Sequence, residues 1–165
     1  FQGYWKDVGT LTSLWDANMD MLSPDSGLDL SDESWPIYAR SVDAPPIYMG
    51  GDSHVSHSAI NRGCDIEGTV ENSVLSPRVT IEKGARVSYS VILPGVTVEA
   101  GSVIEYAIIG EGCHIGRECR VGGMPDSAPG GKWDLTVLAP DCALEDGREI
   151  APGVMLDRYG KEVLK

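Results

Sequence analysis

The chain has 165 residues, with 13 Lys and Arg against 25 Asp and Glu, so its formal net charge is −12. This length predicts one compact domain with an appendage, and 42% apolar residues exclude wholesale disorder. The acidic balance argues against a nucleic-acid partner, because tracking phosphates requires clustered Lys and Arg. No stretch approaches the roughly 18 consecutive apolar residues of a membrane span, so no membrane partner is expected.

The chain opens at Phe1 rather than Met, and we expect a fragment of a longer protein. No basic-then-apolar signal segment opens it. Four cysteines without such a signal predict reduced thiols in a cytoplasmic protein.

Residues 1–23 carry the pattern of a short helix. Thr10 can cap a helix that runs to about Asp20, and Ser23-Pro24 ends it. One face of this predicted helix consists of Leu11, Leu14, Trp15, Asn18, Met19 and Leu22. Residues 24–47, with Trp35-Pro36 and Pro45-Pro46, then predict an irregular linker.

An internal repeat fills the rest of the chain. The predicted coils are Ile60, Ile66 and Val70; Leu75, Ile81 and Val87; Ile92, Val98 and Ile104; Ile109, Ile115 and Val121; and Leu138, Leu144 and Ile150, with Leu156 one step on. The second, third and fourth coils are offset by 17 residues, and the fifth by 29, which is 17 plus a 12-residue insertion within residues 122–134. Three sides of about six residues close one turn, so we predict a parallel β-helix over residues 48–165.

The fold class expected is therefore all-β dominated, with a short helix and an irregular linker before the coils. Gly84, Gly101 and Gly147 each follow an axial aliphatic by three residues and mark the predicted corners. Helical spacings of three and four are missing from this stretch.

The four cysteines, Cys64, Cys113, Cys119 and Cys142, each precede an axial aliphatic by two residues. We expect them to be inert buried thiols rather than zinc ligands, because no short C-x₂₋₄-C pair is present.

The first forty residues and the repeats together resemble one enzyme family. The matching runs are GYWKDVGT at residues 3–10, LWDANMD at residues 14–20, LDL at 28–30, SWPIY at 34–38 and the hexapeptide-type run EGTVENSVL at 67–75. They resemble the C-terminal part of bacterial glucose-1-phosphate adenylyltransferase, also called ADP-glucose pyrophosphorylase, in its catalytic-subunit type. The DVGT run is shared with other sugar nucleotidyltransferases, whereas its combination with W-x-A-N-M-D is highly specific.

The resemblance implies that the full enzyme converts ATP and glucose 1-phosphate into ADP-glucose and pyrophosphate for glycogen synthesis. It also implies a left-handed coil, a homotetramer, and allosteric control by sugar phosphates and adenine nucleotides. The family's G-x-G-x-R-L-x-P-L loop for the ATP phosphates has no match here. We therefore expect residues 1–23 to be the tail end of the nucleotidyltransferase domain, and this chain alone to be inactive.

Asp7 is the one catalytic residue that the resemblance carries over. In the family, the aspartate of W-x-D-V-G-T helps to hold Mg²⁺ against the nucleotide phosphates, so Asp7 is the predicted metal ligand of the full enzyme. In this chain alone the alternative is an exposed aspartate without metal, and no cofactor is expected. Arg40 is the only cationic residue between Lys6 and Arg62, so it is the regulatory candidate for a sugar-phosphate contact; a solvated linker arginine is the alternative.

Two other classes share hexapeptide coils. A trimeric acyltransferase needs a catalytic base, usually His, on a projecting loop, and residues 122–134 contain no His. A trimeric γ-type carbonic anhydrase needs three zinc-binding histidines, but His57 and His114 fall on different sides of the predicted coil, so exposed histidines, His54 included, are expected. A non-enzymatic scaffold is the third alternative.

Overall fold

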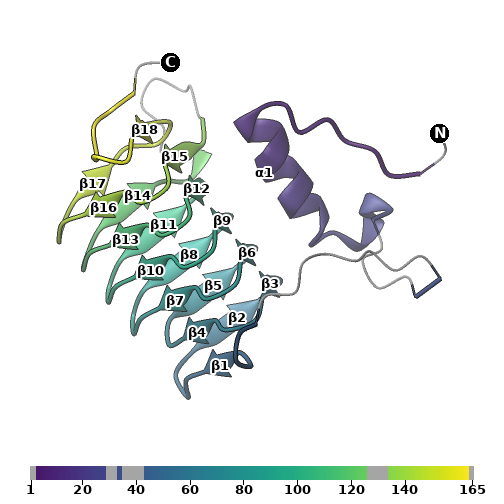
Figure 1. The fold of residues 1–165 in the computed structure, drawn as a ribbon, viewed down its shortest axis with the longest axis horizontal. Helices are drawn as coiled ribbons and strands as arrows, with labels where there is room; N and C mark the ends of the chain where they lie inside the picture. The colour runs from purple at the N-terminus through teal and green to yellow at the C-terminus, as the bar shows by residue number, and fades with distance from the viewer. Residues whose placement is uncertain (1–2, 29–32, 35–42, 126–133, 164–165) are drawn as a thin grey trace.

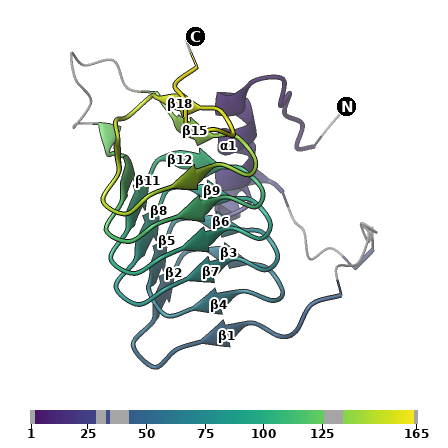
Figure 2. The ribbon, with the colours of Figure 1, turned by 60° about the vertical axis from the view of Figure 1, so that its left-hand side comes forward.

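The computed structural model describes residues 3–28, 33–34, 43–125 and 134–163. The described residues between Tyr48 and Leu156 form a β-solenoid whose parallel strands stack turn upon turn (Figure 1). The strands form three parallel sheets of six strands each, one on every side of the coil (Figure 2). The predicted all-β architecture of parallel coils with one short helix is confirmed.

Each sheet takes one strand from every turn, so sheet 1 begins with β1, sheet 2 with β2 and sheet 3 with β3. Sheet 1 contains β1 (Tyr48–Met49), β4 (Asp65–Ile66), β7 (Thr80–Ile81), β10 (Thr97–Val98), β13 (His114–Ile115) and β16 (Ala143–Leu144). Sheet 2 contains β2 (His54–Ser56), β5 (Thr69–Glu71), β8 (Arg86–Ser88), β11 (Val103–Glu105), β14 (Arg120–Gly122) and β17 (Glu149–Ile150). Sheet 3 contains β3 (Ala59–Ile60), β6 (Val74–Leu75), β9 (Val91–Ile92), β12 (Ala107–Ile109), β15 (Thr136–Leu138) and β18 (Met155–Leu156).

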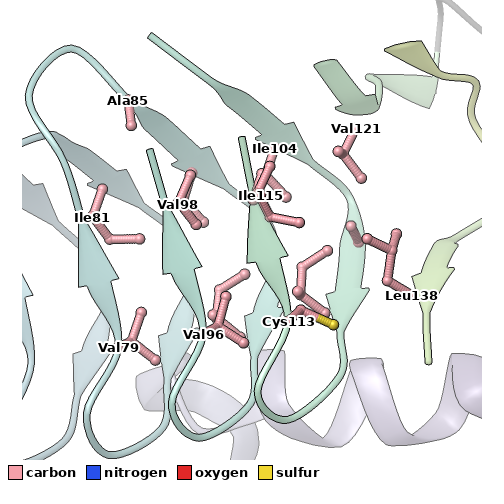
Figure 3. Close-up of a cluster of buried hydrophobic side chains, with 14 of the residues drawn as sticks. Val79, Ile81, Ala85, Val96, Val98, Ile104, Cys113, Ile115, Val121 and Leu138 are labelled. Carbon is pink, nitrogen blue, oxygen red and sulfur yellow. The ribbon is translucent and has the colours of Figure 1, made fainter. Parts of the chain in front are cut away.

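The strand register places the repeated aliphatics on the solenoid axis. In sheet 1 the pairing aligns Ile66, Ile81, Val98, Ile115 and Leu144 in one column, as the spacing predicts. Figure 3 shows Ile81, Val98 and Ile115 on successive strands with their side chains directed into the interior. Because alternate residues of a strand face opposite sides, a register error of one residue would turn this whole column outward.

The first turn begins earlier than the sequence pattern suggests. Met49 pairs with Ile66 and Val55 pairs with Val70, so the register begins before Ile60. Val55 packs against the core, whereas Met49, on the terminal strand of its sheet, is exposed. The Ile66 to Val70 side is two residues shorter than the Ile81 to Val87 side. Gly68 makes this short corner possible, because a Cβ there would lie 2.4 Å from the Ala85 carbonyl oxygen.

The corners differ in how much glycine they contain, although Glu118, with φ of 54°, takes the place of glycine in the corner column of Gly84 and Gly101. Gly84, Gly101 and Gly147 have φ of 76°, 75° and 70°, so the predicted corner glycines do adopt the left-handed region. The corner between sheets 2 and 3 has the same left-handed backbone without glycine. It is built from His57, Asn72, Tyr89 and Tyr106, with φ between 44° and 47°. Larger side chains therefore project from this corner.

The helix α1 (Leu11–Asp20) lies beside the solenoid, and a short 3₁₀ helix, η1 (Pro24–Ser26), follows it (Figure 1). Thr10 is the N-cap, as predicted: its side chain accepts a hydrogen bond from the Ser13 N–H, and the Ser13 hydroxyl accepts one from the Thr10 N–H. No helix in the described part of the chain is long and apolar enough to cross a bilayer.

Candidate functional site

The outer face of sheet 3 is apolar where α1 covers it. Val91, Ile108 and Leu135 are buried there, outside the solenoid core, and Trp15 and Met19 of α1 pack against them. A helix of 10 residues is about 15 Å long, whereas the outer two of three neighbouring strands lie about 10 Å apart. The helix is therefore long enough to cross the rungs β9, β12 and β15 that contribute to this apolar face.

Trp15 is the anchor of this contact. Its indole Nε1 donates a hydrogen bond to the Tyr89 carbonyl oxygen at 2.8 Å. The Trp15 and Tyr106 rings stack with centroids 5.9 Å apart, and Tyr106 stacks in turn on Tyr89 at 4.7 Å. The non-glycine corner thus supplies both an aromatic platform and a backbone acceptor for the helix.

Trp15 and Met19 of the predicted helix face pack on sheet 3, whereas Leu11 is exposed, so the prediction for Leu11 is wrong. The sequence did not indicate the partner of this face. Tyr89 and Tyr106 lie 17 residues apart, which is the repeat period, so the signal for a stacked aromatic pair is present in the sequence. Nothing in the spacing links this pair to Trp15, which is 74 residues away from Tyr89.

The segment before α1 is tied to the last turn of the helix. Lys6 Nζ lies 2.6 Å from Asp20 Oδ2, and the Tyr4 hydroxyl donates to the same oxygen at 2.9 Å. The hydrogen bond with Asp20 raises the pKa of the Lys6 ammonium, and the same bond lowers the pKa of the Asp20 carboxyl. Both groups are therefore held in their charged forms at neutral pH.

Asp7, the predicted metal ligand, is exposed in this segment. Its Oδ1 accepts a hydrogen bond from the Gly9 N–H at 3.0 Å, and no described residue contacts its Oδ2. A carboxylate oxygen is a donor that Mg²⁺ prefers, so Asp7 fits as one ligand of a magnesium ion. Within the described ranges, no group of three or more His, Cys, Asp or Glu is arranged to hold a metal.

Apolar side chains around Asp7 are also exposed. Trp5 is 76% exposed, Val8 51% and Leu11 39%, and all three lie within four residues of Asp7. Large apolar side chains are more often buried in a folded protein, and here three of them are exposed within one short segment.

Arg40, the regulatory candidate, lies outside the described residues. The part of the linker that is described reaches the solenoid at a corner, where the Arg78 guanidinium donates to the Asp43 carbonyl oxygen. Arg78 also lines an open groove of about 430 Å³, together with Pro94, Gly95, Glu111, Gly112, Pro140 and Asp141. The charged residues of this lining are one cation, Arg78, and two acids, Glu111 and Asp141.

The three histidines are exposed, as expected, and lie on separate parts of the surface. His54 is on sheet 2, where Nε2 lies 3.7 Å from Glu71, and His57 Nδ1 lies 2.8 Å from the Asn72 side-chain oxygen. His114 is on sheet 1, with Nε2 3.0 Å from Glu99. They do not converge on one metal-binding point.

All four cysteines are buried free thiols, as predicted. The Sγ atoms of Cys64, Cys113 and Cys119 donate to backbone carbonyl oxygens at 3.1–3.2 Å. Burial raises the pKa of all four thiols, and that of Cys113 to about 11. Figure 3 shows Cys113 among the aliphatic side chains of the core.

Comparison with known proteins agrees with the repeat and with the family resemblance. Residues 48–129 match the family described as GlmU-like, C-terminal hexapeptide. Over 87 residues the chain is 55% identical to a glucose-1-phosphate adenylyltransferase of Geobacillus stearothermophilus, and 51% identical to one of Bacillus mycoides. The match covers 53% of this chain but only 22% and 23% of these relatives, so the chain spans less than a quarter of their length. The resemblance expected from the sequence is confirmed.

Solved structures with similar coils come from acetyltransferases. The acetyltransferase domain of PglB from Neisseria gonorrhoeae, in complex with acetyl coenzyme A, aligns with a TM-score of 0.55 at 19% identity, over 73% of this chain and 58% of that one. A GDP-perosamine N-acetyl transferase from Caulobacter crescentus aligns with a TM-score of 0.54 at 14% identity, over 74% of this chain and 58% of that one. At this identity the likeness concerns the fold alone.

Proposed function

We propose that this chain is the C-terminal part of a glucose-1-phosphate adenylyltransferase, which forms ADP-glucose and pyrophosphate from ATP and glucose 1-phosphate for glycogen synthesis. The observation that carries the proposal is the 55% identity over 87 residues to an enzyme of that name. The GYWKDVGT and LWDANMD runs at residues 3–10 and 14–20 support it.

In this reaction a phosphate oxygen of glucose 1-phosphate attacks the α-phosphorus of ATP, and pyrophosphate leaves. Bound Mg²⁺ would neutralise the negative charge of the phosphates. Asp7 would hold that ion through its exposed carboxylate, and the turn closed by the Gly9 N–H would orient the carboxylate. The remaining ligands would come from the nucleotide, from water and from the rest of the enzyme.

The exposure of the apolar side chains of Trp5, Val8 and Leu11 supports a role of this segment as the last piece of the catalytic domain. In the full enzyme these side chains would be buried against the segment that carries the nucleotide loop. We propose that the 165-residue chain alone makes no ADP-glucose, because the phosphate-binding loop expected of the family has no match in it.

The sharpest test is Asp7→Asn in the full-length enzyme. Removal of one metal-binding charge should lower kcat by about 10²–10³-fold while the melting temperature stays unchanged. Asp25→Asn is the matched control, because Asp25 is exposed and its side chain makes no hydrogen bond within the described residues. An Asp7→Asn enzyme with wild-type turnover, or ADP-glucose formation by the purified 165-residue chain, would refute the assignment.

The β-helix would serve assembly and regulation of a homotetramer. Its rigid flat sides suit subunit association, and α1 connects one of them to the Asp7 segment. Coil packing could then bias the position of that segment in response to sugar-phosphate and adenine-nucleotide effectors. The proposal predicts that a full enzyme without residues 48–165 loses its tetrameric state and its regulation. Retention of both would contradict it.

Arg40 would contribute a sugar-phosphate contact in this scheme. Arg40→Ala in the full enzyme should move the activation curve to higher effector concentration, and Arg62→Ala, which removes the next arginine along the chain, should not. Identical activation curves for Arg40→Ala and the wild type would remove Arg40 from the regulatory site.

A further inference from the structure

The carboxylate of Asp20 holds two side chains of the segment that carries Asp7. Asp20 Oδ2 accepts hydrogen bonds from Lys6 Nζ at 2.6 Å and from the Tyr4 hydroxyl at 2.9 Å. Within the described residues, these two hydrogen bonds join the side chains of residues 3–8 to α1. A carboxylate in the last turn of a helix faces the negative end of the helix dipole, so it is favourable only with a cationic partner such as Lys6.

The two contacts decide which side of the segment faces outward. Tyr4 and Lys6 are two residues apart, and in extended backbone such residues point to the same side. Both are half-buried against α1, whereas Trp5 and Asp7, which alternate with them, are exposed. A shift of one residue would turn Asp7 toward the helix and Lys6 away from it.

The helix itself has a fixed position. Trp15 donates to the Tyr89 carbonyl oxygen and packs on sheet 3, so α1 cannot rotate without losing that contact. Asp20 lies five residues beyond Trp15 on this anchored helix. The hydrogen bonds from Tyr4 and Lys6 to Asp20 therefore fix these two residues relative to the solenoid.

We propose that Asp20 is a positioning residue: by binding Lys6 and Tyr4 together, it sets the direction in which Asp7 presents its carboxylate. This inference rests on the proposed function, because the direction of Asp7 matters only if Asp7 holds the metal. A purely stabilising ion pair would affect Tm, whereas the contact proposed here should affect kcat with little change in Tm. The Lys6 and Asp20 side chains are 28% and 32% exposed, and ion pairs that remain in contact with solvent contribute about 1 kcal/mol or less to stability.

The first arm of the test uses the full-length enzyme. Asp20→Ala should lower kcat about 10- to 100-fold, the range typical of residues that orient a metal ligand, with a Tm change within about 4 °C. Asp20→Asn retains an acceptor oxygen for Tyr4 and should lose less. The exchanged pair Lys6→Asp with Asp20→Lys should recover part of the lost turnover. Asp25→Ala, which removes an exposed acid without a side-chain partner among the described residues, should leave kcat unchanged.

The second arm does not depend on activity and uses the 165-residue chain. Amide hydrogen exchange over residues 3–10, including the Gly9 N–H that binds Asp7, should accelerate in Asp20→Ala and stay at the wild-type rate in Asp25→Ala. Unchanged exchange in Asp20→Ala would overturn the proposal, and so would a kcat within twofold of wild type. A loss of turnover that merely follows a large fall in Tm would also overturn it. If the wild-type full-length enzyme forms no ADP-glucose, the proposed function fails, and the exchange arm still decides whether Asp20 positions the segment.

Discussion

Val98 offers the most direct test of the axial register. It lies on β10, is 0% exposed and sits in the sheet 1 column between Ile81 and Ile115. Val98→Ala would remove two methyl groups from a filled interior and should cost about 2 kcal/mol of unfolding free energy. Val98→Asp keeps most of the volume but places an unpaired carboxylate on the axis, so we expect a cost of about 4 kcal/mol or more.

This cost should be visible in a thermal melt followed by circular dichroism. For a chain of this size, about 4 kcal/mol corresponds to a fall in Tm of roughly 8–16 °C. The matched control is Thr97→Asp, since Thr97 is the preceding residue of the same strand and points outward. It introduces the same charge and should cost less than about 1 kcal/mol.

The deficit of Val98→Asp should also depend on pH. Burial raises the pKa of a carboxyl above its value of about 3.9 in the unfolded chain, so the native state binds the extra proton. The deficit should therefore shrink as the pH falls toward about 4 and grow as the pH rises through the folded pKa. If the Val98→Asp and Thr97→Asp variants have the same Tm at every pH, the assignment of Val98 to the solenoid axis is refuted.

Two further outcomes follow from the helix contact and the thiols. Trp15→Phe should destabilise the chain by about 1 kcal/mol, because it removes the hydrogen bond to Tyr89 while keeping a stacking ring; amide exchange in α1 should accelerate, and no change in exchange would argue against the docking. The four thiols should not react with a thiol reagent at pH 8 in the native chain and should all react after unfolding. Because burial raises the pKa of Cys113 to about 11, the native thiolate should form only near that pH; rapid modification of a native thiol at pH 8 would contradict the buried positions.

The coil register is readable from the sequence because a solenoid is close to one-dimensional. Each turn repeats the same contacts with its neighbours, so the 17-residue offset between Ile81, Val98 and Ile115 specifies which side chains share the axis. The pattern is weaker in the first turn. The spacing does not place Met49 and Val55 in register with later turns, because Gly68 allows a side that is two residues short and breaks the period.

Asp7 is a candidate metal ligand only through the family resemblance, whereas the contacts proposed to orient it join residues that are distant in the sequence. No period connects Trp15 with Tyr89, or Lys6 with Asp20, and both contacts arise only after α1 has packed on the outside of sheet 3. The apolar outer positions Val91 and Ile108 interrupt the apolar-in, polar-out alternation of their strands, and that is the one local sign of a covering element. Which segment provides the cover depends on shape and chain reach, and these are properties of the folded molecule rather than of any short stretch of sequence.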